Sequence, residues 1–307
     1  MGSPEPGPLV TMDGARLEAG AGIAIVGVIG SPVAHSLSPV LHNAAFAALG
    51  LADGWRSFAF EIAPGQAAGA LEAMRRAGIT GLSVTMPHKA DVAALVDECS
   101  DVARRLGAVN CVVNRDGSLF GTNTDGEGFV SSLARGAAFD PEGRRCVVVG
   151  AGGAARAVVL ALAVGGAARV AVVNRTPERA YEAADLAGPV GSVVPLTEGS
   201  IAEAVVEADL VVNATPVGMA GVAAPSGGPG VWLVPPDLLG PGQVAADLVY
   251  APRLTPWLAE AAAGGATALD GLGMLVHQAA AQLVLWTGVE PPVEAMWQAA
   301  EAASAHW

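Results

Sequence analysis

Cysteine is scarce in this chain, with three residues in a length of 307. Three thiols cannot all pair, and Cys111 and Cys146 fall inside predicted strands, where a buried packing role is the usual one. No Cys/His cluster has the spacing of metal ligands, so we expect no metal site. The length suggests two domains of ordinary size and is ample for two cores.

Basic residues and long apolar runs are also few. Lys and Arg number 16 against 29 Asp and Glu, and the net charge of −13 argues against a broad nucleic-acid surface. The longest obvious apolar run, residues 157–164, is far below the ~20 residues of a membrane span. Residues 1–20 lack the basic and apolar regions of a signal peptide, so we predict a flexible tail there and a cytoplasmic protein.

Predicted strands and helices alternate along the rest of the chain, which indicates an α/β fold with mostly parallel sheets covered on both faces. A polar, glycine-rich joint at 121–128 interrupts the pattern, and residues 220–242 are predicted to form an irregular loop. The expected strands are 23–29, 55–62, 79–85, 110–115, 145–149, 169–173, 210–214 and 244–249. The expected helices are 39–49, 66–77, 91–96, 102–106, 128–135, 154–164 and 271–307.

The most informative stretch is 145–156, Arg-Cys-Val-Val-Val-Gly-Ala-Gly-Gly-Ala-Ala-Arg. It predicts a short strand, a glycine turn at Gly150, Gly152 and Gly153, and a helix from Ala154. Such a turn leaves backbone N–H groups and a helix N-terminus free to face a pyrophosphate. The third position of the glycine pattern holds Ala155, and an ordinary glycine turn in an α/β fold is the alternative interpretation.

The next strand, 169–173, ends in Asn174-Arg-Thr-Pro-Glu-Arg179. NAD-binding domains usually carry an acidic residue at that point, which accepts hydrogen bonds from the ribose 2′-OH. Here no carboxylate precedes Glu178, and Arg175 and Arg179 flank the position. Guanidinium groups bind a 2′-phosphate, whereas a carboxylate repels one, so the predicted cofactor is NADP.

Two loops of the first half carry candidate chemistry. Ser36 and Ser38 lie two residues apart on a loop that opens a helix, and two hydroxyls at a helix N-terminus suit a carboxylate. The alternative is that Ser38 is only an N-cap. Lys89 follows a strand that runs into Pro87, and ligands of open α/β sheets bind at such strand ends. Lysine can act as a general acid or base there, and a surface lysine without a role is the alternative.

Three further positions follow. Asp125 is an acid in a glycine-flanked turn at the joint, where an Asx-turn is the alternative to a ligand contact. Tyr250 follows a strand of the second half, and Gln278 lies about two turns into the last helical region. His35, His42 and His277 receive no catalytic role.

These motifs, in this order around the dinucleotide loop, resemble the shikimate dehydrogenase family from about Ile23 to the C-terminus. That family reduces 3-dehydroshikimate to shikimate with NADPH, a step toward chorismate and the aromatic amino acids. The resemblance implies a substrate-binding and catalytic domain at 21–124 and a Rossmann-like NADP domain at 125–270. It also implies C-terminal helices at 271–307 that return to the first domain, and an active site in the cleft between the domains.

The resemblance also implies residue roles. Ser36 and Ser38 would bind the substrate carboxylate, and Lys89 and Asp125 would form the catalytic pair. The other implied substrate contacts are Thr85, Lys89, Asn110, Asp125, Tyr250 and Gln278. The implied NADP contacts are Gly150, Ala151, Gly152, Gly153, Ala154, Asn174, Arg175, Thr176, Arg179, Leu248 and Gly271.

One departure and several alternatives remain. The family often has Asn where this chain has Ser83, which has a shorter reach and no amide. The nearest alternative is a quinate/shikimate dehydrogenase with broader substrate or NAD use, and a non-catalytic NADP-binding sensor is another. A methylenetetrahydrofolate-type dehydrogenase gives no reason for Ser36 and Ser38. Whether Lys89 or Asp125 moves the proton, and whether the protein is a monomer or a homodimer, stay open.

Overall fold

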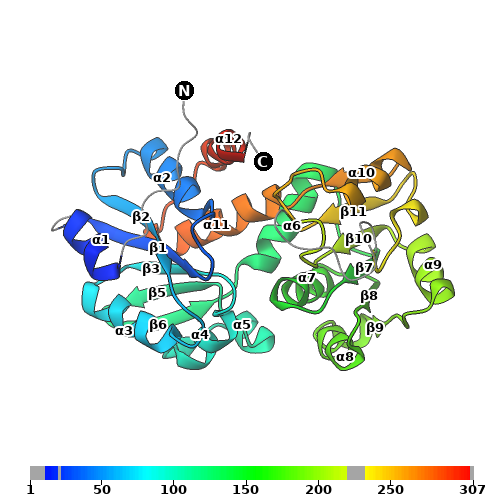
Figure 1. Ribbon diagram of the computed structural model, residues 1–307, viewed down its shortest axis with the longest axis horizontal. Coiled ribbons are helices and arrows are strands. Elements are labelled where there is room, and N and C mark those ends of the chain that lie inside the picture. Colours follow the sequence, from blue (N-terminus) through cyan, green and yellow to red (C-terminus); the bar gives the residue numbers. More distant parts are fainter. Residues whose placement is uncertain (1–10, 20–21, 220–231, 305–307) are drawn as a thin grey trace. The chain divides into compact units, whose positions relative to one another are not determined.

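The computed structural model describes residues 11–19, 22–219 and 232–304. The chain divides into two compact units, drawn in Figure 1. The first unit runs to Thr124 and resumes at Val276, and the second runs from Asp125 to Leu275. Within the described residues, no helix combines the length and the apolar character that crossing a bilayer requires.

The first unit is built on a six-stranded sheet of order β2-β1-β3-β5-β6-β4. Its pairings are parallel except that β5 runs antiparallel to both β3 and β6. The strands are β1 (Ala24–Gly30), β2 (Trp55–Glu61), β3 (Gly81–Val84), β4 (Glu98–Cys99), β5 (Cys111–Arg115) and β6 (Ser118–Thr122). The helices are α1 (Met12–Ala19), α2 (Ser38–Ala48), α3 (Ala67–Ala77), α4 (Lys89–Leu95), α5 (Asp101–Leu106), the later part of α11 (Leu272–Thr287), and α12 (Val293–Ser304).

Helices cover both faces of this first sheet. On one face, side chains of α1, α3, α4 and α5 pack with strand residues such as Ile25 and Leu82 in one core. On the other face, α2 contacts β1, β2 and α12, and the α11 residue Trp286 donates its indole N–H to Val112 O at 3.1 Å. A side chain at Gly81 would collide with the Trp286 indole, so glycine lets α11 lie directly on the sheet.

The second unit holds a six-stranded sheet of order β12-β11-β10-β7-β8-β9, in which every pairing is parallel. Its strands are β7 (Arg145–Val149), β8 (Arg169–Val173), β9 (Gly191–Val193), β10 (Leu210–Asn213), β11 (Val244–Asp247) and β12 (Thr267–Leu269). The helices are α6 (Asp125–Ala137), α7 (Gly153–Val164), α8 (Pro177–Asp185), α9 (Glu198–Val206) and α10 (Pro256–Ala263), with short 3-10 turns η1 (Gly188–Val190) and η2 (Pro236–Leu238).

Two cores sandwich this second sheet. Residues of α6, α7 and α8, such as Phe129 and Leu162, pack on one face, and residues of α9 and α10, such as Val205 and Trp257, pack on the other. The central strands are buried on both faces, which is why they read as continuous apolar runs in the sequence. The strand order changes direction between β7 and β10, and a parallel sheet binds ligands at such a switch point.

The structure confirms the predicted fold class: two α/β units with parallel-rich sheets, the second Rossmann-like. The strand predicted at 169–173 is β8 with the same bounds. The other expected strands also form, several with ends that differ by one or two residues. The boundary between the units falls between Thr124 and Asp125, and again inside α11 after Leu275.

Two predictions need correction. The flexible tail predicted over 1–20 is wrong for residues 12–19, which form α1 and bury Met12 and Ala15 against the first sheet. The other residues of that tail, apart from Thr11, lie outside the described part. The predicted joint at 121–128 contains the boundary between the units, but it does not interrupt the regular structure over that whole range, because β6 ends at Thr122 and α6 begins at Asp125. Residues 220–231 of the predicted loop at 220–242 lie outside the described residues, and the rest of it contains η2.

Candidate active site

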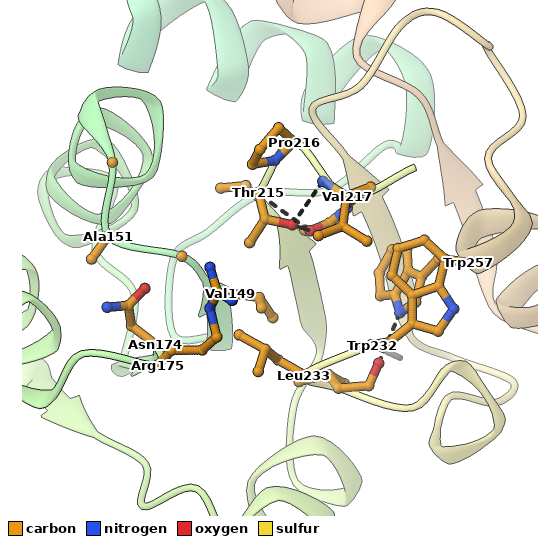
Figure 2. A pocket seen from close by; sticks show the side chains of 15 residues that line it. Val149, Ala151, Asn174, Arg175, Thr215, Pro216, Val217, Trp232, Leu233 and Trp257 are labelled. Atoms are coloured by element: carbon orange, nitrogen blue, oxygen red, sulfur yellow. Dashed lines mark hydrogen bonds between the residues drawn. The ribbon is translucent and has the colours of Figure 1, made fainter. Parts of the chain in front are cut away.

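A pocket of about 430 Å³ lies at the carboxyl ends of β7, β8 and β10 in the second unit. Figure 2 shows Asn174 and Arg175 on one side of it and Trp232 and Trp257 on the other. Its lining residues are Val149, Gly150, Ala151, Gly152, Asn174, Arg175, Asn213, Ala214, Thr215, Pro216, Val217, Trp232, Leu233, Val234 and Trp257. The pocket therefore occupies the place where a parallel sheet of this order binds a nucleotide.

The glycine turn forms one wall of this pocket. Gly150 has φ 111°, a left-handed conformation that favours glycine, and a Cβ there would lie 3.0 Å from Ala214 O. At Gly152 a Cβ would meet nothing within 4 Å in the described part of the chain beyond its two neighbours, so glycine here leaves room beside the helix start rather than relieving a collision. Helix α7 begins at Gly153, and its first N–H groups have no partner within the helix. This wall fits a pyrophosphate.

The other side of the pocket carries positive charge. Asn174 donates from Nδ2 to Thr176 O at 2.9 Å, which closes the turn between β8 and α8. Arg175 is exposed and lines the pocket, whereas Arg179 is exposed in the first turn of α8 outside the lining. No Asp or Glu occurs among the described residues of the lining. The charge of this edge therefore suits a phosphate on the adenosine ribose better than a free 2′-hydroxyl.

Leu248 and Gly271, which are predicted to contact the nicotinamide end of NADP, lie against each other in the second unit. Gly271 N donates to Val249 O at 3.1 Å, and a Cβ on Gly271 would lie 2.2 Å from Leu248 O. Only glycine permits this close approach of two backbones. Asp270 fixes the same turn, since it accepts from Leu272 N at 3.0 Å and from Arg253 Nε at 2.8 Å.

A buried carboxyl, Asp247, joins three segments at this edge of the sheet. It accepts hydrogen bonds from Asn213 Nδ2 (3.0 Å), Thr255 Oγ1 (2.7 Å) and Val249 N (3.0 Å). Burial raises the pKa of Asp247, and these three donors act in the opposite direction. Tyr250, three residues further on, is half-buried, and burial raises the pKa of its phenol.

In the first unit, the ends of β1 and β3 meet. Ser31 N donates to Met86 O at 2.9 Å, and a Cβ on Gly30 would lie 2.4 Å from the Thr85 methyl carbon. Residues 31–37, between β1 and α2, form the serine loop, which therefore starts beside the half-buried Thr85. Ser36 Oγ accepts from Ser38 N at 3.3 Å.

Ser38 is the first residue of α2 and is buried, and Leu37 occupies the N-cap position without a side-chain cap. The alternative that Ser38 is only an N-cap is therefore wrong. Both serines stay candidates for a carboxylate site at this helix end.

Lys89 is the first residue of α4 and is half-buried. The turn before it is closed by a hydrogen bond from His88 N to Thr85 O at 3.1 Å. The Lys89 carbonyl accepts a hydrogen bond from Val109 N at 2.9 Å, and Asn110 directly follows Val109 in the chain. The structure thus brings Thr85, Lys89 and Asn110 to neighbouring positions at the strand ends.

Asn110 also connects, through hydrogen bonds, to the part of α11 that belongs to the first unit. It donates from Nδ2 to Thr124 Oγ1 at 3.0 Å and accepts from Thr124 N at 2.8 Å. Thr124 Oγ1 donates to Gln278 O at 3.1 Å. Gln282 donates from Nε2 to Gln278 Oε1 at 2.9 Å and to Asn110 O at 3.1 Å. Two predicted site residues, Asn110 and Gln278, therefore belong to one buried polar network.

Sequence reasoning missed Thr124 and Gln282. Thr124 stands directly before the predicted Asp125, and Gln282 lies one helical turn after Gln278, so each had a weak local signal. Asp125 itself is buried at the N-terminus of α6, in the second unit. Its predicted place in a glycine-flanked turn is wrong, because acidic residues are favourable in the first turn of a helix and the helix extends back to include it.

Three segments of the chain match family models. Residues 28–112 match the shikimate dehydrogenase substrate binding domain, 132–219 match shikimate / quinate 5-dehydrogenase, and 271–301 match the shikimate 5'-dehydrogenase C-terminal domain. A curated shikimate dehydrogenase (NADP(+)) from Moorella thermoacetica is 45% identical over 286 residues, which cover 90% of this chain and 92% of the relative. The chain belongs to the shikimate dehydrogenase family.

Solved structures of the shikimate dehydrogenase family agree with this assignment. The Thermus thermophilus enzyme, solved in complex with NADP(H) and shikimate, has a TM-score of 0.78 and 38% identity, with 92% of this chain and 100% of that chain covered. Quinate dehydrogenase from Corynebacterium glutamicum, solved with NAD, has a TM-score of 0.78 and 32% identity over 90% and 98% of the two chains. The resemblance stated from the motifs is thereby confirmed.

Within the shikimate dehydrogenase family, Ser83 is the departure noted from the sequence. It is buried in β3 and pairs in register with Cys111 of β5. A serine hydroxyl there is shorter than an asparagine amide and has one fewer donor. The residue roles implied by the family stay predictions for this chain.

Proposed function

We propose that this protein catalyses the reversible reduction of 3-dehydroshikimate to shikimate with NADPH, in the pathway to chorismate and the aromatic amino acids. The observation that carries this proposal is the 45% identity, over nine-tenths of both chains, to a shikimate dehydrogenase (NADP(+)). The arginine-edged pocket of the second unit, which has no acid in its described lining, supports NADP as the cofactor.

We assign NADP binding to the second unit. The N–H groups at the start of α7 and the open space beside Gly152 fit a pyrophosphate, and Arg175 with Arg179 would bind the 2′-phosphate. Asn174 and Thr176 shape that turn, while Leu248 and Gly271 would border the nicotinamide. When bound, NADPH supplies the hydride, and the protein supplies binding, orientation and electrostatics.

We assign substrate binding mainly to the first unit. Ser36 and Ser38 offer hydroxyls at the start of α2 for the substrate carboxylate. Thr85, Asn110 and Gln278 offer polar groups for ring hydroxyls, and Tyr250 of the second unit is proposed to add a phenol. Thr124 bonds to both the Nδ2 and the Oδ1 of Asn110, and Gln282 bonds to the Asn110 backbone carbonyl, so the side-chain amide is fixed before the substrate arrives.

Lys89 and Asp125 are the proposed catalytic pair. Reduction of a ring ketone develops negative charge on the carbonyl oxygen, and the Lys89 ammonium at Nζ would stabilise that charge and donate a proton. In the direction of oxidation, the same group would act as the base. Asp125 would hold a ring hydroxyl and keep Lys89 charged, so the two residues are expected to act as one unit.

A second candidate function is quinate oxidation, with broader cofactor use. The similarity to the quinate dehydrogenase solved with NAD is the observation that favours it. Arg175, together with the lack of an acidic residue at positions 174–177 directly after β8, favours NADP instead. Values of kcat/KM for shikimate and quinate, each measured with NADP and with NAD, separate the two functions.

We further propose that the enzyme works in the cytoplasm, as a monomer or a homodimer. A biosynthetic dehydrogenase that draws on dissolved NADPH and a small acidic substrate needs no macromolecular partner for its chemistry. Light scattering of the purified protein decides between the two oligomeric states, and fractionation of cells that express it tests the location.

A further inference from the structure

His88 is a fully buried histidine directly before Lys89. Its Nε2 lies 2.7 Å from Ile62 O. A carbonyl oxygen only accepts hydrogen bonds, so Nε2 must carry a proton and donate it. The other ring nitrogen, Nδ1, is buried and has no hydrogen-bond partner among the described residues. A polar ring enclosed in this way is costly to bury, and the hydrogen bond to Ile62 O offsets part of that cost.

Ile62, the residue whose carbonyl bonds to His88, also has a backbone hydrogen bond to the end of β1. Ile62 N donates to Gly30 O at 3.0 Å, at the point where β1 ends and the serine loop begins. Ile62 O then receives the His88 imidazole. Ile62, the residue after β2, therefore bonds with its N–H to the last residue of β1, directly before the serine loop, and with its carbonyl to the turn of residues 85–88 before Lys89.

Glu61, the neighbour of Ile62, strengthens this connection. Its Oε2 accepts from Val33 N at 2.9 Å, inside the serine loop. A hydrogen bond from the Ser31 side chain and this contact with Val33 lower the pKa of Glu61. The serine loop is thus bound to Glu61, and the turn before Lys89 is bound to the next residue, Ile62, at the end of β2.

We propose that His88 is a positioning residue for Lys89. Its imidazole fixes the start of α4 to Ile62, and the Lys89 carbonyl is fixed from the other side by Val109 N. The Lys89 backbone is held between these two bonds, which limits where its Nζ can reach. The inference rests on the proposed function, in which Nζ must meet the reacting oxygen, and a misplacement of about 1 Å can cost on the order of 10²-fold in rate.

Three variants test this role. His88→Leu puts an apolar side chain of moderate size in place of the imidazole and removes the N–H donor to Ile62 O. His88→Gln keeps an N–H donor on a side chain of similar reach. His42→Leu is the matched control, because His42 is also fully buried in the first unit, bonds through one ring nitrogen to Ser57 Oγ at 2.9 Å and leaves the other without a partner in the described structure. Burial lowers the pKa of His42 to about 3.

The kinetic readout is kcat for shikimate oxidation at a temperature well below every Tm. We expect His88→Leu to lower kcat by about tenfold or more with little change in KM for NADP, and His88→Gln to recover most of that loss. His42→Leu should lower Tm and leave kcat near the parent value. A kcat within about twofold of the parent in His88→Leu overturns the proposal, and so does a loss of kcat in both leucine variants that follows their Tm.

A second readout does not depend on catalysis. Amide hydrogen exchange at Val109, whose N–H is donated to Lys89 O, should speed up in His88→Leu and stay unchanged in His42→Leu. Unchanged exchange in His88→Leu overturns the positioning role whatever the activity. A parent enzyme that fails to oxidise shikimate while Val109 exchange rises in His88→Leu rejects the proposed function and keeps the role of His88 in holding the turn.

Discussion

Glycine is needed at two positions of the second unit, Gly271 and Gly152, for different physical reasons, and alanine substitution should distinguish the two reasons. At Gly271 a new Cβ would lie 2.2 Å from Leu248 O and 2.5 Å from Leu248 C. At Gly152 a new Cβ would meet no atom within 4 Å among the described residues, apart from its own chain neighbours. Gly271→Ala should therefore damage the fold, and Gly152→Ala should damage the space in which the pyrophosphate is proposed to bind.

The contact geometry sets the expected magnitudes. Relieving the Gly271 collision requires two backbones to separate by about 1 Å, and overpacking of this kind costs about 1–3 kcal/mol. For a unit of this size that corresponds to a fall in Tm of about 2–12 °C. The same 1–3 kcal/mol, lost from cofactor binding in Gly152→Ala, raises the NADP dissociation constant by about 5–150-fold. The Tm of Gly152→Ala should stay within about 3 °C of the parent, because its backbone conformation suits alanine.

Calorimetry of each variant, with and without NADP, measures both quantities. Gly199→Ala, an exposed helical glycine whose added Cβ would also meet nothing, is the matched control and should leave NADP affinity unchanged. The reasoning fails if Gly271→Ala has the Tm of the parent. It fails equally if Gly152→Ala binds NADP as tightly as Gly199→Ala does.

Further predictions concern charge and chemistry. Arg175→Asp should raise KM for NADP by about tenfold or more and reduce the preference for NADP over NAD. The reason is that a charge-assisted hydrogen bond is worth ~1.5–3 kcal/mol, and the exposure of Arg175 places its bond at the lower end. An unchanged ratio of kcat/KM for NADP and NAD discards the assignment. Lys89→Ala should lower kcat by about 10²- to 10⁴-fold with a smaller effect on KM. When it is combined with Asp125→Asn, the loss of kcat should be smaller than the product of the losses in the two single variants. Losses that multiply fully would mean that the two residues act independently. Glu61→Gln should lower stability at neutral pH, because the lowered pKa of the Glu61 carboxyl contributes stability at pH values above its ordinary pKa near 4.5. The difference in Tm between the parent and Glu61→Gln should close as the pH falls through the pKa of Glu61 in the folded protein. A constant difference in Tm across that pH range contradicts the linkage.

Local patterns carried most of what the sequence could predict. The glycine turn, the end of β8 and the strand before Lys89 are each specified within a few residues, so their sequence signals were sufficient. These features depend on backbone conformation at one place, which a single stretch of sequence encodes.

Features that depend on tertiary packing were not predictable in this way. The hydrogen bond from Gln282 to Asn110 joins residues 172 positions apart, and it exists because the later part of α11 lies on the first sheet. The hairpin partner β6 lacks a strong alternation of polar and apolar residues, and its strand state comes from pairing with β5. Helix α1 was missed because glycine and proline dominate the surrounding composition, although Met12 and Ala15 share a face and are buried.

The central claim is that this chain is an NADP-dependent shikimate dehydrogenase, and steady-state assay of the purified protein tests it most directly. Formation of NADPH is followed by absorbance with shikimate or quinate as substrate and NADP or NAD as cofactor. The account predicts the highest kcat/KM for shikimate with NADP, and a value lower by about tenfold or more when NAD replaces NADP. No NADP reduction with shikimate, or a clear preference for quinate with NAD, would contradict it.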